Sequence, residues 1–366
     1  MSDFAHVGHD WPIRIVQVGA GGMGRAWLRT IDASPEVELV GLVDLDVDTA
    51  RRALSEERIP GGVAIGTSVS EVAAATAADA VVNVTVPAAH LPVNLEAFAA
   101  GLPVLCEKPA APTIRDAYRQ AAAARASGQL LMISQSRRYF AALDAVRAQL
   151  SSVGAVSSVS TRFFREAHFP GFRQEMEHPL LIDMAIHQFD VARSIIGAAP
   201  VSVYCEEHNR SGSWYRGAAD AHAIFAFEGG ARYVFTGSWV AVGEQTAWNG
   251  EWRVDGERGS IRWDGAADVR FTSADMQDVS EPLAVAAGAP EEIAGSLREF
   301  VASLRTGERP SNIAEENILS LGMVFAATRS AETGERVDIG DFLERAREEA
   351  IAAERDDAIR AELQRL

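Results

Sequence analysis

The sequence predicts an α/β protein with an N-terminal doubly wound parallel sheet and a C-terminal α/β part built on a mostly antiparallel sheet. Two observations predict this fold class. Apolar runs typical of strands alternate with helical segments up to about residue 135, which indicates βαβ units. Beyond residue 150, short strand-like runs follow one another without intervening helices, which favours antiparallel pairing. We therefore expect one domain over residues 1–135 and a second over residues 136–366.

Composition limits the classes of partner and location. The chain has 366 residues, 48% of them hydrophobic, and a formal net charge of −17. Nucleic acid and anionic membranes repel such an acidic chain, and no apolar run reaches the ~20 residues of a membrane-spanning helix. The N-terminal segment lacks a basic stretch followed by an apolar run, so we expect no signal peptide. Two cysteines, Cys106 and Cys205, are too few for a disulfide framework, and the cytoplasm is the expected location.

The first expected strand, residues 13–18, leads directly into a glycine-rich motif and then a helix over residues 25–31. In this context Gly19 permits the tight turn, Gly21 lets the backbone approach a pyrophosphate, and Gly24 allows close packing of helix on strand. The helix N-terminus then faces the phosphates. The residues expected to contact a dinucleotide here are Gly19, Gly21, Gly22, Met23 and Gly24.

Asp44 directly follows the next expected strand, residues 37–43, and lies 20 residues after Gly24. An acid at this distance hydrogen-bonds the adenine ribose hydroxyls, and its charge would repel a 2′-phosphate. Leu45 and Asp46 supply no cation to hold that phosphate. We therefore expect NAD rather than NADP as the cofactor. A strand-end turn residue is the alternative interpretation of Asp44.

The alternation of helices and strands continues to the end of the first domain. The expected elements are a helix around residues 51–54, a strand at 79–84, a helix at 91–100 closed by Gly101, a strand from 102 to Lys108, a helix at 113–127 and a strand at 130–133.

Lys108 is the only lysine of the chain, because 33 of the 34 Lys and Arg residues are arginines. Chance survival in a lysine-poor composition is one interpretation. The other is an active-site ammonium, since arginine cannot share or move a proton. The position of Lys108 at the end of an expected strand favours the second interpretation, because open α/β sheets bind ligands at the carboxyl ends of their strands.

The second half is predicted to contain strands near residues 155–165, 200–207, 219–227, 231–240, 250–255, 259–263 and 268–272, with one helix at 181–196. Helices close the chain at about 290–306, 314–333 and 340–365. The last one is charged and amphipathic, which is typical of a solvated helix face and less typical of a subunit contact.

Asp183 and His187 lie four residues apart in an otherwise apolar helical segment, which places both side chains on one helix face. A structural Asp–His hydrogen bond is one interpretation. A metal pair is another, but it would need a third ligand such as His178, and we expect no metal. The third interpretation is acid–base chemistry, because a nearby carboxylate favours the protonated form of a histidine.

A nicotinamide site, a lysine and an Asp/His pair together predict oxidation of a secondary alcohol. His187 would act as the base that takes the hydroxyl proton. Lys108 would hydrogen-bond the substrate oxygen and stabilise the developing alkoxide charge. Asp183 would bind a neighbouring hydroxyl or tune the other two residues.

These residues resemble those of the glucose-fructose oxidoreductase/inositol dehydrogenase (Gfo/Idh/MocA) oxidoreductases, and the resemblance covers most of the chain. The glycine motif, Thr85 with His90, the tripeptide 107–109 and the Asp183/His187 pair occur in the family's order and at about its spacing. The Glu-Lys-Pro tripeptide is the most specific mark. The resemblance implies a Rossmann domain followed by an α/β domain with a large open sheet, which often forms dimer or tetramer contacts. We therefore expect a homodimer or homotetramer through the C-terminal sheet and a small-molecule carbohydrate or polyol substrate.

The resemblance also implies the roles of single residues. The catalytic set would be Lys108, Asp183 and His187, and Glu107 would position the nicotinamide half of the cofactor. The cofactor-binding residues that it adds to the glycine motif and Asp44 are Thr85, Val86, His90, Glu107 and Lys108. Arg138 matches an arginine that is common after the last strand of the first domain, and we place it at the substrate.

Two departures from the family pattern bear on the substrate more than on the reaction. Val86 stands where the family usually has a proline. Residues 177–179, Glu-His-Pro, replace three glycines that many members carry, and they add bulk and polarity.

The polar and aromatic segment from Arg165 to His178 is interpreted as a loop over the substrate, with a solvated loop as the alternative. The expected substrate-binding residues are Lys108, Arg138, Arg165, His168, His178, Asp183 and His187. Five aromatic residues could form a sugar platform, or belong to the core or to a subunit interface: Trp214, Tyr215, Trp239, Trp248 and Trp252.

The leading hypothesis is an NAD-dependent oxidoreductase that transfers a hydride between a sugar, polyol or glycoside alcohol and nicotinamide. A second hypothesis is a redox-neutral enzyme that retains its NAD and cleaves a glycoside or interconverts sugars. A third is a non-catalytic NAD-binding sensor with a partner protein.

Overall fold

The computed structural model describes residues 4–8, 11–169, 171–278 and 289–366. The first three residues of the N-terminal segment and Pro170 of the polar loop therefore lie outside the described part of the chain. The described residues form two compact units. The first consists of Met1–Ser136, Pro290–Ile318 and Ala346–Leu366, and the second of Arg137–Ala289 and Leu319–Arg345. The domain boundary at residue 135 stays a prediction. The two compact units divide the chain differently, because two C-terminal segments belong to the first unit.

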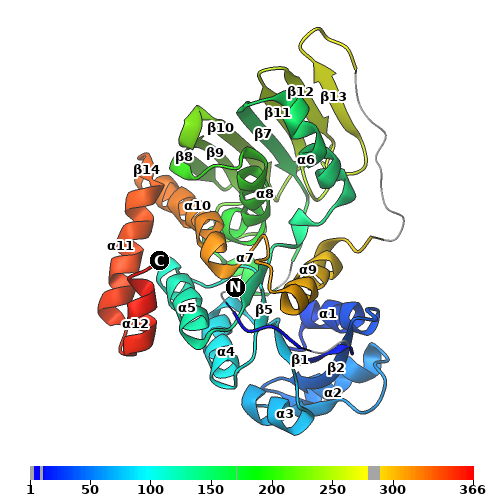
Figure 1. The fold of residues 1–366 in the computed structure, drawn as a ribbon. Helices are drawn as coiled ribbons and strands as arrows, with labels where there is room; N and C mark the ends of the chain where they lie inside the picture. Colours follow the sequence, from blue (N-terminus) through cyan, green and yellow to red (C-terminus); the bar gives the residue numbers. More distant parts are fainter. Residues whose placement is uncertain (1–3, 9–10, 170, 279–288) are drawn as a thin grey trace. The chain divides into compact units, whose positions relative to one another are not determined.

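The first unit contains a six-stranded parallel sheet with the order β3-β2-β1-β4-β5-β6 (Figure 1). Its strands are β1 (Ile13–Val18), β2 (Val37–Val43), β3 (Ala64–Gly66), β4 (Ala80–Asn83), β5 (Val104–Glu107) and β6 (Leu131–Ser134). The helices between them are α1 (Gly22–Asp32), α2 (Val47–Glu56), α3 (Val69–Thr76), α4 (Pro87–Ala99) and α5 (Ile114–Ser127). This confirms the predicted doubly wound sheet, in which the carboxyl ends of β1, β2, β4 and β5 share one edge.

The second unit contains an eight-stranded sheet with the order β13-β12-β11-β7-β10-β9-β8-β14. Its strands are β7 (Val156–Phe164), β8 (Pro200–His208), β9 (Asp220–Phe227), β10 (Arg232–Ser238), β11 (Glu251–Gly256), β12 (Gly259–Trp263), β13 (Val269–Ser273) and β14 (Val337–Asp338). All neighbouring pairs are antiparallel except β7 with β10, which run parallel. The predicted mostly antiparallel sheet is thus confirmed.

The helix that carries the Asp/His pair packs on one face of this sheet. It consists of a π-helical segment, η2 (Leu180–Ala185), followed by α8 (Ile186–Ile196). Phe189 of α8 has its ring centroid 4.8 Å from that of Phe225 and 5.3 Å from that of Phe235. Helix α6 (Ala141–Val153), which the sequence did not predict, contacts β12 and β13 of the same unit.

The C-terminal segments differ from the prediction in one respect. Helices α9 (Glu292–Thr306) and α10 (Ala314–Thr333) lie where they were expected. The single helix expected at 340–365 was wrong, because the chain forms α11 (Ile339–Ala353) and α12 (Asp357–Leu363). The side chain of Asp356 begins α12 by accepting hydrogen bonds from the amides of Ala358 and Ile359.

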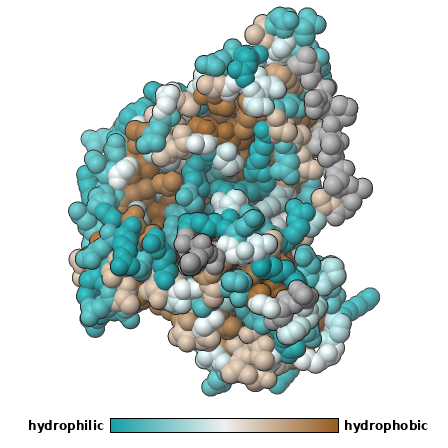
Figure 2. Space-filling model, viewed as in Figure 1, coloured by the Kyte–Doolittle hydropathy of each residue, from teal (hydrophilic) through white to brown (hydrophobic). Residues whose placement is uncertain are grey.

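The surface over α11 and α12, at the left of Figure 2, is largely hydrophilic. This agrees with the expected solvated helix face. Within the described ranges, no helix combines the length and the apolar character that crossing a bilayer requires.

Candidate active site

The glycine-rich loop between β1 and α1 has the backbone that a dinucleotide site needs. Gly19 has a φ of +102°, and a Cβ there would lie 2.7 Å from the carbonyl oxygen of Val84. A Cβ on Gly24 would lie 2.3 Å from the carbonyl oxygen of Gly19. By contrast, a Cβ on Gly21 or Gly22 would meet no atom of the described chain within 4 Å. The packing of the chain itself therefore requires glycine at positions 19 and 24. Gly21, at the start of α1, faces open space, as the predicted contact with a pyrophosphate requires.

Gln17 holds this loop in place and was missed by the sequence analysis. Its side chain is fully buried in β1, and its Nε2 donates to the carbonyl oxygens of Gly19 and Gly24, at 2.9 Å each. A polar residue among the apolar positions of an expected buried strand was the available signal, because buried amides need partners.

Asp44 both closes a turn and faces the glycine-rich loop. Its Oδ2 accepts from the backbone amide of Ala20 at 2.8 Å, and its Oδ1 accepts from the amide of Asp46 at 3.0 Å. Asp44 therefore does act as a turn residue, as the alternative interpretation proposed. Each carboxylate oxygen has a second acceptor site, so the half-buried carboxylate can also bind the ribose hydroxyls. Met23 and Leu45 beside these residues are exposed.

His90 does not have the predicted surface for a cofactor contact, because its side chain is completely buried in α4. Its Nε2 lies 3.1 Å from the carbonyl oxygen of Thr85, and its Nδ1 lies 3.0 Å from that of Pro109. Burial lowers the pKa of the imidazole. These contacts position the loops that follow β4 and β5, and the cofactor contact of His90 stays a prediction. Val86 in the first of these loops is 58% exposed.

A chain of buried amides supports the same two loops. Thr85 Oγ1 donates to Asn83 Oδ1, and Asn83 Nδ2 donates to Asn94 Oδ1 at 2.8 Å. Asn94 Nδ2 donates to Gln120 Oε1, and Gln120 Nε2 donates to the carbonyl oxygen of Ala110. Such a connected network fixes the geometry around the loop that follows Lys108. The sequence analysis did not identify Asn94 and Gln120, which lie on different helices.

Glu107 and Lys108 stand at the carboxyl end of β5. The buried carboxylate of Glu107 accepts from the indole Nε1 of Trp27 at 2.8 Å and from the backbone amide of Lys108 at 3.0 Å. The Lys108–Pro109 peptide bond is cis. Lys108 is partly buried, which leaves its side chain accessible from the edge of the sheet. Burial raises the pKa of the Cys106 thiol, so this neighbour is not a nucleophile.

In the second unit, Asp183 belongs to the π-helical segment η2, and His187 to the first turn of α8. A regular α-helix was expected over both residues. Single π-helical turns within helices occur frequently at functional sites. Oδ2 of Asp183 accepts from Nε of Arg173 at 2.5 Å, and His187 is 6% exposed.

His178 is engaged by carboxylates. Its Nδ1 lies 2.5 Å from Glu207 Oε2, and its Nε2 lies 3.5 Å from Glu332 Oε1. The hydrogen bond and the charge of Glu207 hold the pKa of His178 above its usual value. An ion pair thus holds His178, and its contact with the substrate stays a prediction. In the part of the chain that the structure describes, no three His, Cys, Asp or Glu residues are grouped to hold a metal ion.

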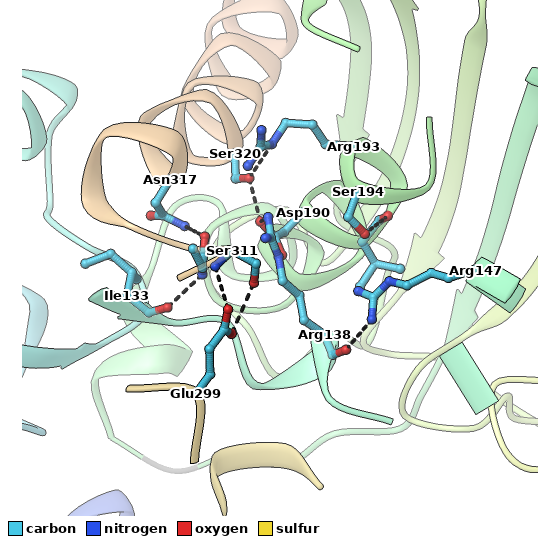
Figure 3. A network of polar contacts seen from close by, with 12 residues as sticks. Ile133, Arg138, Arg147, Asp190, Arg193, Ser194, Glu299, Ser311, Asn317 and Ser320 are labelled. Atoms are coloured by element: carbon cyan, nitrogen blue, oxygen red, sulfur yellow. Dashed lines mark hydrogen bonds and ion pairs between the residues drawn. The ribbon is translucent and has the colours of Figure 1, made fainter. Parts of the chain in front are cut away.

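Arg138 also forms an ion pair with a carboxylate. Its Nε and Nη2 donate to the two carboxylate oxygens of Asp190 at 2.6 and 2.8 Å. Ser320 donates to the same carboxylate and accepts from Arg193 (Figure 3). Burial by itself raises the pKa of Asp190, but the charge and hydrogen bonds of Arg138 outweigh this effect and hold it below the usual range. This buried bidentate ion pair favours a structural role for Arg138, and its predicted substrate contact stays a prediction.

The neighbouring Arg137 is the arginine that lies near His187. The two side chains line a small pocket with Gln188, Val191, Asn249, Trp252 and Trp263. Arg137 Nη1 donates to Asn249 Oδ1 at 3.2 Å. Gln188 is 1% exposed, and its Oε1 has no hydrogen-bond partner among the described residues. The sequence analysis missed this cluster, because β11, β12 and α8 bring its members together from distant positions.

The polar loop and the aromatic residues form a second cluster in this unit. The guanidinium of Arg165 lies over the ring of Trp248 at 4.6 Å, and the exposed ring of His168 stacks on Trp214 at 3.6 Å. Trp239 and Trp252 are buried, which makes them core residues and not a platform for sugars. Tyr215 is buried as well, at 3% exposure, so the platform interpretation can apply to Trp214 and Trp248 at most.

Comparison with known families matches both halves of the chain. The family model described as "Oxidoreductase family, NAD-binding Rossmann fold" matches residues 13–135. The model described as "GFO/IDH/MocA C-terminal domain" matches residues 145–262.

Related proteins align with nearly the full length of this chain. The uncharacterized protein y4oX of Sinorhizobium fredii is 30% identical over 352 residues, which are 90% of this chain and 97% of the relative. Inositol 2-dehydrogenase of Streptomyces avermitilis is 27% identical, with 89% of this chain and 94% of the relative covered. The 1,5-anhydro-D-fructose reductase of Ensifer adhaerens is 24% identical, with coverage of 88% and 97%.

Solved structures show the same fold. An oxidoreductase from Agrobacterium radiobacter, in complex with NAD+, L-tartaric acid and magnesium, superposes with a TM-score of 0.80 at 21% identity, covering 90% of this chain and 99% of the other. The WlbA dehydrogenase from Chromobacterium violaceum, in complex with NADH and UDP-GlcNAcA, gives 0.78 at 20% identity, with coverage of 92% and 98%.

Proposed function

The chain belongs to the Gfo/Idh/MocA family of oxidoreductases with an NAD-binding Rossmann fold, and we propose that it is an NAD-dependent dehydrogenase for a secondary alcohol of a sugar, polyol or glycoside. One observation carries this proposal. The only lysine of the chain follows β5 at the carboxyl edge of the NAD-binding sheet, directly after a carboxylate that Trp27 holds in place.

Each residue of the proposed active site has its own role in the reaction. NAD, when bound, supplies the hydride acceptor. His187 accepts the proton of the substrate hydroxyl, and the Lys108 ammonium donates a hydrogen bond to the same oxygen and stabilises its negative charge. Asp183, held by Arg173, binds a neighbouring hydroxyl. Glu107 orients the nicotinamide half of the cofactor.

The functions of the relatives support the class of substrate. Their names include inositol 2-dehydrogenase, 1,5-anhydro-D-fructose reductase and D-apiose dehydrogenase, and these names refer to a polyol or to sugars. A cytoplasmic location is part of the same proposal, and the two free cysteines, Cys106 and Cys205, support it.

The sheet of the second unit supports a homodimer or homotetramer. Three large apolar side chains on neighbouring strands are exposed, namely Val201 on β8, Ile224 on β9 and Val234 on β10, at 39%, 44% and 36%. Adjacent exposed apolar residues on a sheet face favour contact with a second copy. Light scattering of the purified protein tests this part of the proposal.

The decisive experiment is NADH formation by the purified protein across inositols, aldoses, aldonates and simple glycosides, first with NAD and then with NADP. Turnover with NAD on one compound class is the expected result. Turnover with NADP alone would contradict the assignment of Asp44. Tightly bound NAD with product formed but no net NADH would replace the dehydrogenase by the redox-neutral alternative.

A further inference from the structure

The carboxylate of Asp183 forms an ion pair with a cation from the polar loop. Arg173 lies in the short helix α7 (Phe172–Glu175). Its Nε donates to Oδ2 of Asp183 at 2.5 Å, and the exposed fractions of the two side chains are 29% and 12%. The guanidinium is therefore anchored at one end beside a residue of the proposed catalytic set and is open to solvent at the other.

The remaining side-chain donors of Arg173 have no hydrogen-bond partner among the residues that the structure describes. An arginine has five N–H donors, and its hydrogen bonds to other described residues involve Nε alone. The guanidinium carbon lies over the rings of Phe169 and Phe172, at 5.5 and 4.8 Å from their centroids. These rings limit the orientation of the group without supplying an acceptor, so the Nη1 and Nη2 donors remain available to a ligand.

Two other arginines lie in the clusters that contain His187 and Phe169. Arg137 lines the pocket that contains His187. Arg165 lies over Trp248, whose ring centroid is 6.1 Å from that of Phe169, and its Nε has no partner among the described residues. In a chain with a net charge of −17, a guanidinium beside Asp183 and another beside His187 favour a negatively charged ligand.

We propose that the substrate is a hydroxy acid of the sugar series, an aldonate or uronate, whose carboxylate binds the Nη1 and Nη2 donors of Arg173. This inference deepens the proposed function and rests on it. The planar fork of a guanidinium matches the two oxygens of a carboxylate. Neutral polyols present hydroxyl groups, and they make no bidentate ionic contact. A phosphate dianion carries more charge than a carboxylate, and Asp183 beside Arg173 repels it more strongly.

Binding of matched pairs to the enzyme loaded with NAD+ tests the proposal by calorimetry. The pairs are D-gluconate with D-glucitol, D-glucuronate with D-glucose, and D-galacturonate with D-galactose, and D-glucose 6-phosphate serves as the phosphate probe. We expect at least one acid to bind about tenfold more tightly than its neutral partner. The Arg173→Gln variant should lose this preference, so that each acid and its neutral partner bind with similar affinity.

Arg162→Gln is the matched control. Arg162 is also an arginine of the second unit that pairs with a carboxylate, Glu251, and lies over a phenylalanine ring, Phe164. It lies in β7, outside both clusters described around Asp183 and His187, so this variant should keep the preference for acids. Thermal unfolding establishes that both variants fold, and Arg173→Lys, which keeps the charge but loses the fork, should retain part of the preference.

The outcomes separate this inference from the proposed function. Equal affinity within every pair, no binding of any acid, tighter binding of the phosphate, or a preference that survives Arg173→Gln would each overturn it. If NADH forms from neutral polyols and no acid binds, the proposed dehydrogenase activity is supported and the proposed acid substrate is wrong. Acid binding that depends on Arg173, without NADH formation from any probe, supports the inference and removes the dehydrogenase.

Discussion

The indole N–H of Trp27 donates to Oε1 of Glu107 across 2.8 Å, and both side chains are buried. This bond connects the helix that begins at the glycine-rich loop with the strand that ends beside Lys108. The other carboxylate oxygen accepts from the amide of Lys108. One carboxylate thus couples the geometry of the cofactor loop to the position of the proposed catalytic lysine.

Trp27→Phe should weaken NAD+ binding by about tenfold. The substitution removes a donor from a buried carboxylate, which costs about 1–3 kcal/mol. Fluorescence titration with NAD+ measures the affinity, and urea unfolding measures the stability. Trp239→Phe is the control, because Trp239 is equally buried but its Nε1 has no partner among the described residues. Equal loss of NAD+ affinity in both variants would contradict the coupling.

Asp44→Asn should shift the cofactor preference toward NADP. An asparagine can still accept from the amide of Ala20, so the loop contact survives, but the negative charge that repels a 2′-phosphate is gone. We expect the ratio of the NADP and NAD+ dissociation constants to fall by about tenfold. Asp46→Asn removes a charge two residues away, at the exposed start of α2, and should change the ratio little. The assignment fails if both variants shift the ratio equally.

Arg138→Met should lower the free energy of unfolding by about 3–5 kcal/mol, because it leaves the buried carboxylate of Asp190 without its cation. The double variant Arg138→Met/Asp190→Leu should recover most of that loss. Urea denaturation of the single and double variants tests both statements. A substrate-binding role for Arg138 would instead appear as a raised KM with unchanged stability, and that result would contradict the structural assignment.

The His178–Glu207 pair predicts a pH-dependent stability. The pKa of His178 is raised in the folded chain, so its contribution is fully present below the ordinary histidine pKa of about 6.5 and is lost as the pH rises through the raised value. The melting temperature of His178→Gln should therefore lie below that of the wild type at about pH 6. The difference should shrink toward about pH 9. A difference that grows with pH would exclude the charged pair.

The fold and the edge of the site were predictable from the sequence, because they depend on local periodicity and on where each strand ends. Glycine-rich turns, Asp44 and Lys108 follow strands directly, so topology alone brings them to one edge. The strand β3 was not assigned, since three residues carry no periodic signal. The partners of His178 and Arg138 were also not predicted. Glu207 and Asp190 lie 29 and 52 residues away, and spacing within a helix gives the face of a residue but not the side chain that it meets.

The roles of Gln17, Trp27 and Arg173 were likewise not predicted from the sequence. Each is an ordinary residue in its own segment, and its importance arises from one buried or partly buried acceptor elsewhere. A lone buried glutamine or tryptophan in an apolar element indicates that a partner exists, because unsatisfied buried donors are costly. It does not indicate which loop or carboxylate the partner is.

Lys108→Ala provides the most direct test of the central claim that the only lysine of this chain performs the chemistry. The measurement is the rate of NADH formation on the best substrate of the panel, together with the dissociation constant of NAD+. We expect kcat to fall by at least about a hundredfold, a much larger effect than any loss of NAD+ affinity, while the melting temperature stays close to that of the wild type. A variant that forms NADH at the wild-type rate would contradict the account.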